Sequence, residues 1–186
     1  MTIASKSGGR LIAVVGPSGV GKDSVMAGLK GALPDLHLVR RVITRAPDLG
    51  GEIYDAVSVA QFEAMVQDEA FAAHWGAHGL HYGIPMSVRH QLAKGTDCLV
   101  NFSRTALAQA SVVFPRLVVL NITAQPKTLA QRLAARGRES VDEITKRLGQ
   151  ADKPLPKGLD VLHLANDGPL SQTVARAAAL LQPLRV

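Results

Sequence analysis

Aromatic residues and cysteine are scarce in this chain of 186 residues, and it has no long apolar run. Phenylalanine, tyrosine and tryptophan together make up 4% of the residues, too few for a surface that stacks nucleic-acid bases. The one cysteine, Cys98, stands in an apolar stretch, so we expect a buried thiol and no internal disulfide. No apolar run is long enough to cross a membrane.

Other absences bear on where the protein works. The first ten residues are polar and lack the apolar segment of a signal peptide. The sequence contains no internal repeat and no low-complexity segment, and 47% of its residues are hydrophobic, which favours a folded domain. Together with the single cysteine, these features predict a cytoplasmic enzyme that does not bind a membrane.

The net charge is +6, and arginines outnumber lysines. A basic protein binds either nucleic acid or a small polyanion. The basic residues here are scattered along the chain and do not form a tail, and arginine favours bidentate recognition of phosphate. We therefore expect a phosphorylated small molecule as the partner, and no nucleic acid.

A glycine-rich segment follows the apolar run Leu11–Val15 and precedes a helix-like stretch, Ser24–Leu33. It fits a P-loop, in which backbone N–H groups and a lysine, here Lys22, contact the phosphates of a nucleotide. Asp23 stands where Ser or Thr usually follows the lysine. An ordinary glycine-rich turn is the alternative, and the flanking strand and helix disfavour it. The predicted loop residues are Gly16, Pro17, Ser18, Gly19, Val20, Gly21, Lys22, Asp23 and Ser24.

Strand-like and helix-like runs alternate along the chain. The sequence predicts strands at Leu11–Val15, Leu36–Ile43, Cys98–Phe102, Leu117–Ile122 and Val161–Leu164. It predicts helices at Ser24–Leu33, Arg104–Ala110, Pro126–Ala135, Val141–Gln150 and Leu170–Leu181. This alternation indicates an α/β fold, a P-loop NTPase core with a parallel sheet flanked by helices. We expect one kinase domain over residues 1–186, with its core at 10–44 and 96–186.

A long insertion, at about 45–95, separates the second and third core strands. It is expected to contain a helix at Val59–Asp68, a hairpin of Phe71–Trp75 and Leu80–Tyr82, and a helix from Met86. Insertions of this length between core strands usually carry function, so we expect this one to bind the substrate. A second irregular segment, about 136–147, holds Arg136 and Arg138 on a glycine-containing bend, which is typical of a mobile lid.

Basic residues in three places can stabilise the transition state of phosphoryl transfer. The first group follows the second predicted strand, where ligands bind in parallel α/β folds, and the others lie in the last helices. They are Arg41 and Arg45; Arg132, Arg136 and Arg138; and Lys146 with Arg147. A solvated helix face is the alternative for each, and it is the favoured reading for Arg132 alone. For Arg136, Arg138 and Arg147 we favour a functional role.

The nature of the acceptor decides which catalytic groups are needed. A phosphate acceptor needs no strong general base, because its oxygen is already ionised, but the repulsion between two anions must be reduced by cations. Three histidines, His74, His78 and His81, could suggest a zinc site. They would alternate between the two faces of the hairpin, however, and no carboxylate or cysteine completes a set of metal ligands. A histidine near a bound phosphate is the favoured reading.

At these residues the sequence resembles the guanylate kinase family over nearly its whole length. Gly16–Lys22 resembles the P-loop of that family, Thr44-Arg45 with Gly51-Glu52 its acceptor-phosphate segment, and Gly79–Gly83 its hairpin. Tyr54 stands where the family has a phosphate-binding tyrosine. Further similarities lie at Arg132-Leu133, Arg136-Gly137 and Lys146–Leu148, which resemble the lid, and at Asn166-Asp167, which resembles a pair near the adenine.

Departures from the family concern the reading of guanine. The family uses a glutamate, a small hydroxyl residue and an aspartate, where this sequence has Ala73, Ile84 and Ser103. A guanine would meet no carboxylate here. A site that recognises its substrate through such hydrogen bonds loses a large factor in kcat/KM when they are absent. Asp48 also stands where the family has a second phosphate-binding arginine. The comparison implies that phosphate binding is kept and base reading is lost.

This combination is similar to the ribose 1,5-bisphosphate phosphokinase family of phosphonate degradation, through Lys22-Asp23-Ser24 and the run His74–Pro85. The resemblance implies transfer of the γ-phosphoryl group of ATP, with Mg²⁺, to the 1-phosphate of ribose 1,5-bisphosphate. The product is 5-phosphoribosyl 1-diphosphate. A sugar bisphosphate has no base to read, in agreement with the missing carboxylates.

The expected roles follow from these patterns. The catalytic residues are Lys22, Arg136 and Arg147; ATP is bound by the loop with Arg132 and Asn166; Mg²⁺ is assigned to Asp23 and Ser24; and the sugar phosphate is bound by Arg41, Thr44, Arg45, Tyr54, His81, Tyr82, Ser103 and Arg138. A nucleoside monophosphate kinase with altered base choice and a non-catalytic guanylate kinase-like binding module stay open as alternatives. A homodimer also stays open.

Overall fold

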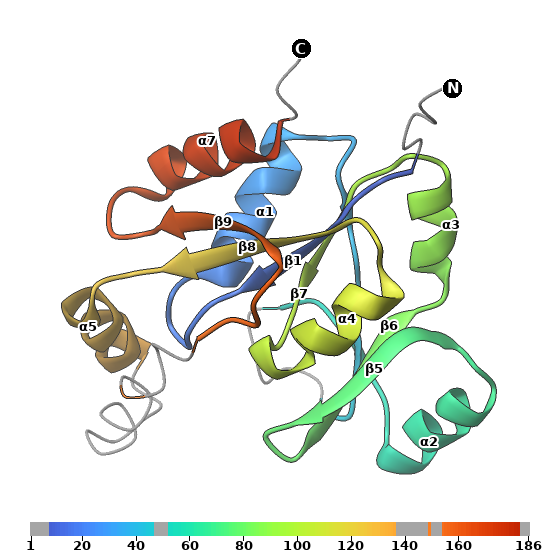
Figure 1. Cartoon of the computed structure of the whole chain (residues 1–186). Helices are drawn as coiled ribbons and strands as arrows, with labels where there is room; N and C mark the ends of the chain where they lie inside the picture. Colours follow the sequence, from blue (N-terminus) through green and yellow to red (C-terminus); the bar gives the residue numbers. More distant parts are fainter. Residues whose placement is uncertain (1–7, 47–51, 137–148, 150–153, 183–186) are drawn as a thin grey trace, which may run out of the picture.

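The central sheet of the computed structural model is parallel throughout and has the strand order β2-β7-β1-β8-β9 (Figure 1). The structure describes residues 8–46, 52–136, 149 and 154–182. The strands are β1 (Leu11–Val15), β2 (His37–Leu38), β7 (Cys98–Asn101), β8 (Leu117–Thr123) and β9 (Asp160–Ala165). Every residue of the central strand β1 is buried, as expected for an apolar run in a sheet covered on both faces. The predicted α/β fold is confirmed.

Helices and a second sheet cover the two faces (Figure 1). On one face α1 (Lys22–Ala32) and α7 (Leu170–Leu181) lie side by side, and Leu29 and Ala177 join Ile12 of β1 in a buried cluster. On the other face η1 (Arg104–Ala106) and α4 (Leu107–Val113) pack against the sheet through the cluster that contains Val15 and Leu107. Helix α5 (Pro126–Arg136) follows β8.

The second sheet has the order β4-β3-β6-β5. It consists of β3 (Val42–Ile43), β4 (Asp55–Ala56), β5 (Phe71–Ala77) and β6 (Leu80–Pro85), accompanied by α2 (Val59–Gln67) and α3 (Ser87–Ala93). Strands β5 and β6 form the antiparallel hairpin that the sequence predicts. Their residues Trp75, Tyr82 and Ile84 enter the same buried cluster as Val15 of β1. One apolar core therefore fixes the second sheet against the first.

The prediction of one strand over Leu36–Ile43 is wrong. The segment forms two strands, because β2 pairs with β7 in the central sheet whereas β3 pairs with β4 and β6 in the second sheet. Arg41 lies in the crossing between them, and its carbonyl accepts a hydrogen bond of 2.9 Å from Asp55 N. An apolar run fits a strand in either sheet, so periodicity does not reveal the crossing.

Other expectations have simple outcomes. Cys98 is fully buried as predicted, and burial raises the pKa of its thiol to about 11, so the thiol stays protonated at neutral pH. In the ranges that the structure describes, no helix has the length and apolar character needed to cross a membrane. The predicted helix Val141–Gln150 and the predicted lid beyond Arg136 lie outside the described residues, apart from Gly149.

Candidate active site

The glycine-rich loop connects the carboxyl end of β1 to the first turn of α1. Gly19 and Gly21 have φ angles of 83° and 91°, which side chains rarely tolerate. A Cβ at Gly21, the N-cap residue of α1, would lie 2.9 Å from Nδ2 of Asn166. The loop thus brings the N-terminus of α1 to the carboxyl edge of the sheet, where anions bind in such folds.

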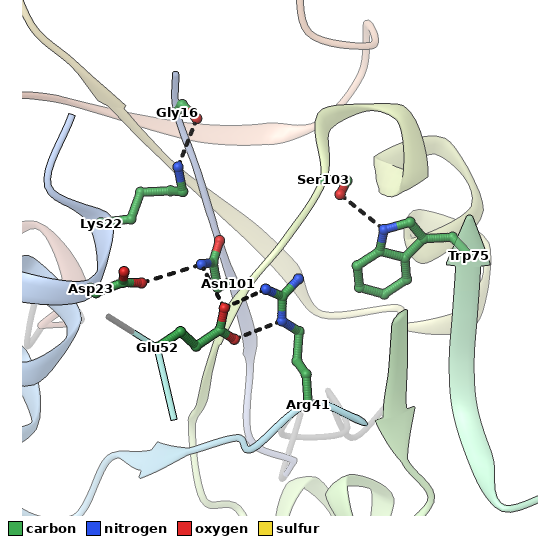
Figure 2. Close-up of polar contacts among 8 residues, drawn as sticks. All are labelled: Gly16, Lys22, Asp23, Arg41, Glu52, Trp75, Asn101 and Ser103. Atoms are coloured by element: carbon green, nitrogen blue, oxygen red, sulfur yellow. Dashed lines mark hydrogen bonds and ion pairs between the residues drawn. The ribbon is translucent and has the colours of Figure 1, made fainter. Parts of the chain in front are cut away.

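Lys22 folds back over this loop. Its Nζ donates a hydrogen bond of 3.0 Å to the carbonyl oxygen of Gly16 (Figure 2) and one of 3.2 Å to that of Pro17. Burial is the main cause that lowers the pKa of Lys22 from 10.5 to about 8. Two phosphates beside Nζ would supply the negative charge that the buried ammonium lacks, so the lysine is placed to bind a polyphosphate.

Charges from four residues act on Lys22 as well. Asp23 and Glu52 raise its pKa, whereas Arg41 and Arg104 lower it, all with smaller effects than burial. Groups from α1, the second sheet and the segment after β7 therefore share one electrostatic environment. This places the proposed acceptor side of the site next to the nucleotide loop.

A chain of polar contacts joins the start of α1 to the second sheet (Figure 2). Nδ2 of Asn101, at the end of β7, lies 3.4 Å from Oδ1 of Asp23 and 3.3 Å from Oε2 of Glu52. Glu52 accepts two hydrogen bonds from Arg41, at 2.7 and 2.5 Å. Arg41 is 5% exposed, and its guanidinium lies 4.9 Å from the centre of the Tyr82 ring. A buried arginine held by a carboxylate and an aromatic face is thus part of the site.

Three more predicted acceptor residues lie around the chain that follows β3. The guanidinium of Arg45 lies 5.6 Å from the centre of the Tyr54 ring. The Tyr54 hydroxyl donates to the carbonyl of Ala46 at 2.6 Å. Oγ1 of Thr44 accepts a hydrogen bond of 2.8 Å from the backbone N–H of His81. These contacts fix the segment of Thr44 and Arg45 against the hairpin and Tyr54.

His81 and Tyr82 were both predicted to bind the substrate, but their side chains lie on different sides of β6, and the role of His81 stays a prediction. Neighbouring residues of a strand point to opposite faces. Tyr82 is buried in the core cluster, whereas the ring of His81 lies on the α2 side, 5.4 Å from the ring of Phe62. Only the backbone of His81 contacts the acceptor segment, through Thr44. Its imidazole is therefore not placed to bind the same phosphate as Tyr82.

The predicted nucleotide residues Asn166 and Arg132 meet at the loop. Nδ2 of Asn166 donates to the carbonyl of Val20 at 2.8 Å, and Nη1 of Arg132 donates to the same oxygen at 3.3 Å. Asn166 is buried, and its Oδ1 has no hydrogen-bond partner within the described part of the chain. An unpaired buried acceptor costs free energy unless a ligand or water pairs with it, so the arrangement fits a bound nucleotide.

Ser103 is hydrogen-bonded to Trp75 of strand β5 in the second sheet. Its Oγ accepts a hydrogen bond of 2.9 Å from Nε1 of Trp75 (Figure 2). The indole also stacks on Phe102 and Tyr82, with ring centres 4.5 and 5.6 Å apart and interplanar angles of 23° and 11°. Ser103 therefore lies at the carboxyl edge as predicted, but its oxygen already has a partner within the protein.

The side-chain contacts that the structure describes do not test the predicted roles of Ser24, Arg136, Arg138 and Arg147. Ser24 is exposed in the first turn of α1. Arg136 ends α5 and its side chain is outside the described part, as are Arg138 and Arg147. Their roles stay predictions.

Sequence reasoning missed four residues that shape this site. Asn101 lies near the end of a predicted strand and Arg104 two residues beyond that strand, so their position at the carboxyl edge was a usable signal. Glu52 stood out only through the resemblance of Gly51-Glu52 to the acceptor-phosphate segment of the family, and Trp75 carried no such signal in the sequence. The pairing of Glu52 with Arg41 and the stacking of Trp75 depend on how the two sheets meet.

A nucleotide loop at the carboxyl edge of a parallel sheet, beside a second sheet with a buried arginine just before its strand β3, defines a P-loop kinase with a separate acceptor-binding region. The family model for guanylate kinase matches residues 8–176. The chain belongs to the guanylate kinase family, in the group whose curated members are named ribose 1,5-bisphosphate phosphokinase.

The relatives that support this assignment match almost end to end. The ribose 1,5-bisphosphate phosphokinase of a Ruegeria species is 50% identical, with 97% of this chain and 96% of the relative covered. That of Agrobacterium fabrum is 44% identical, with 92% and 96% covered. A crystal structure of guanylate kinase from Anaplasma phagocytophilum has a TM-score of 0.67 at 15% identity, with 94% of this chain and 85% of that chain covered. The last similarity shows the fold.

Proposed function

We propose that this protein transfers the γ-phosphoryl group of ATP to the 1-phosphate of ribose 1,5-bisphosphate, forming 5-phosphoribosyl 1-diphosphate and ADP in phosphonate catabolism. The names of its curated relatives support this reaction. The observation in this chain that carries it is Arg41, buried beside the nucleotide loop just before β3, together with candidate base-reading positions that are apolar or already bonded within the protein. Ala73 and Ile84 are buried apolar residues, and Ser103 is bonded to Trp75.

On the donor side, the loop binds the phosphates of ATP and Lys22 acts on the group in transfer. Its ammonium leaves the carbonyls of Gly16 and Pro17 and compensates the charge on the phosphoryl oxygens. Asn166 offers its unpaired Oδ1 to the nucleotide. Arg132 adds a positive charge at the same carbonyl of Val20.

On the acceptor side, Arg41, Arg45, Tyr54 and Tyr82 bind the sugar phosphate, with Thr44 and Arg138 as further donors. The ionised oxygen of the 1-phosphate attacks the γ-phosphorus, and the bond between that phosphorus and the β-phosphate oxygen breaks. ADP leaves with the electron pair of that bond. No general base is needed, because the attacking oxygen is already ionised. Arg41 reduces the repulsion between the two anions, and its pairing with Glu52 fixes its orientation.

Arg136 and Arg147 are proposed to complete the catalytic set from the lid. Their contribution is expected late, when the reacting phosphates are enclosed and water is excluded. Cations that act only on the transition state raise the turnover number more than they tighten ATP binding.

Asp23 and Ser24 are proposed to handle Mg²⁺. A carboxylate beside a polyphosphate is repelled unless a cation lies between them, and oxygen donors suit Mg²⁺. Asp23 presents a carboxylate at the start of α1, and a carboxylate oxygen suits this ion, whereas Asn101 turns its Nδ2 to that carboxylate and Glu52 is paired with Arg41. The bound ion neutralises charge on the phosphates. A role in the first turn of α1, through the helix dipole, is the alternative for Asp23.

Substitution Asp23→Asn separates these two roles. We expect the Mg²⁺ concentration for half-maximal activity to rise several-fold and the affinity for Mn²⁺, measured by electron paramagnetic resonance with ADP bound, to fall in parallel. The assays are run well below pH 8, because Asp23 also raises the pKa of Lys22. Asp35→Asn, an exposed carboxylate just beyond the other end of α1, is the control. An unchanged metal requirement with a slightly lower melting temperature would leave only the helix-dipole role.

A coupled assay of ADP release tests the proposed function. We expect ribose 1,5-bisphosphate to be used with a kcat/KM orders of magnitude above those of GMP, AMP and dTMP, because each missing charged hydrogen bond costs about 1.5–3 kcal/mol. GMP turnover equal to that of the sugar bisphosphate would instead indicate a nucleoside monophosphate kinase. Binding of ATP without turnover of any acceptor would indicate a binding module.

A further inference from the structure

We propose that Trp75 is a specificity-determining residue: its indole fills a slot beside Arg41 in which an acceptor's nucleobase could stack, and so restricts the enzyme to acceptors without a base. The proposal rests on the proposed function, since it explains the choice of acceptor in that reaction. It gives a functional role to Trp75, the only tryptophan of the chain.

The indole is held on several sides. Its ring stacks on Phe102, which follows β7, and on Tyr82 of the neighbouring strand β6. Nε1 donates to Oγ of Ser103. Because its one donor is satisfied and its faces are packed, the ring has a single favourable position. Its exposed fraction is only 8%, so the indole fills this space almost completely.

This position is on the acceptor side of the site. The Arg41 guanidinium lies 6.0 Å from the centre of the indole (Figure 2) and 4.9 Å from the centre of the Tyr82 ring. A phosphate bound by Arg41 would therefore have the Trp75 slot within the reach of an attached nucleoside. A nucleobase needs apolar faces to stack on and a polar group at its edge. Phe102, Tyr82 and Ser103 provide those features, and the indole already uses them.

The neighbouring hairpin residues close the remaining space. Ala73 and Ile84 are a cross-strand pair, and both are buried in the core cluster that contains Trp75. Neither offers a hydrogen-bonding side chain to a base. A nucleoside monophosphate would have to expel the indole and break its bond to Ser103 before its base could enter. A sugar bisphosphate meets no such obstacle.

Substitution Trp75→Ala tests the proposal by emptying the slot. We expect free indole to raise the melting temperature of this variant and to leave the wild type unchanged, and the KM for GMP to fall about tenfold or more. Trp75→Phe, which keeps a ring in the slot, should behave like the wild type towards GMP. Phe114→Ala makes a cavity in the same cluster at the opposite edge of the sheet, and its KM for GMP should stay equal to that of the wild type.

The outcomes separate this proposal from the proposed function. A folded Trp75→Ala variant that neither binds indole nor improves with GMP overturns the role of Trp75, even if ribose 1,5-bisphosphate remains the best acceptor. A wild type that does not use ribose 1,5-bisphosphate overturns the proposed function, while indole binding still reports on the slot.

A measurement on the wild type covers the case in which Trp75→Ala does not fold. Trp75 is the only source of tryptophan fluorescence. We expect its emission to stay blue and its quenching by acrylamide to stay weak when ribose 1,5-bisphosphate binds, because the indole remains in its slot. A red shift with stronger quenching would show that the indole leaves when the acceptor enters, and would overturn the proposal.

Discussion

Replacing Lys22 with Met is expected to lower kcat about 10²–10³-fold while leaving the protein folded, because a positive group next to the transferring phosphoryl is removed. The stability of the unliganded protein should rise at the same time. Lys22 is largely buried and its pKa is lowered to about 8, so its charged form is held in an unfavourable place. Activity at this position is thus obtained at the expense of stability.

The pH dependence has a definite sign. Between pH 8 and 10.5 the unfolded chain keeps the proton on Lys22 that the folded protein has lost, so the wild type becomes more stable as the pH rises through this interval. Below pH 8 both states carry the proton and the full penalty remains. Lys22→Met should therefore be more stable than the wild type by roughly 1–3 kcal/mol at pH 7, and the difference should vanish above pH 10.5.

Urea unfolding at several pH values, together with steady-state kinetics, measures both effects. Lys30→Met is the matched control, since Lys30 lies on the same helix but is exposed and donates to the carbonyls of Pro34 and Leu36. Lys30→Met should keep normal activity. Its free energy of unfolding relative to the wild type should not change between pH 8 and 10.5. Near-normal turnover in a folded Lys22→Met variant would refute the P-loop assignment.

Replacing Arg41 with Met is the second change with a large expected effect. It should raise the KM for the acceptor about 10–100-fold, because charged hydrogen bonds to its phosphate are lost. It should also destabilise the protein by about 3–5 kcal/mol, because Glu52 loses its partner inside the fold. The double variant Arg41→Met with Glu52→Met should recover much of this stability but not the affinity for the acceptor.

Arg40→Met provides the comparison. Arg40 is the preceding residue and pairs with Asp55 at 3.2 Å, but the two side chains are 59% and 51% exposed. Loss of this surface pair should change stability by less than about 1 kcal/mol and leave the acceptor KM unchanged. If Arg41→Met were destabilised yet kept the acceptor KM of the wild type, Arg41 would be a structural residue outside the acceptor site.

The sequence by itself determined the nucleotide half of the molecule. The strand, loop and helix from Leu11 to Ala32 follow from local rules: an apolar run for a buried strand, glycines where φ is positive, and a helix directly after the loop. The parallel sheet and the hairpin were predictable for the same reason, since their periodicity is a property of neighbouring residues.

Only the tertiary structure decided the acceptor half. Whether the run Leu36–Ile43 is one strand or two depends on which sheet each half meets, and not on its own residues. The same holds for Arg41 with Glu52 and for Trp75 with Ser103, which come together because the hairpin packs on β1 through one core. Burial then sets their chemistry: it holds the arginine with its carboxylate, closes the slot beside it and lowers the pKa of Lys22. Long-range packing, which no local pattern encodes, therefore shapes the acceptor side of this site.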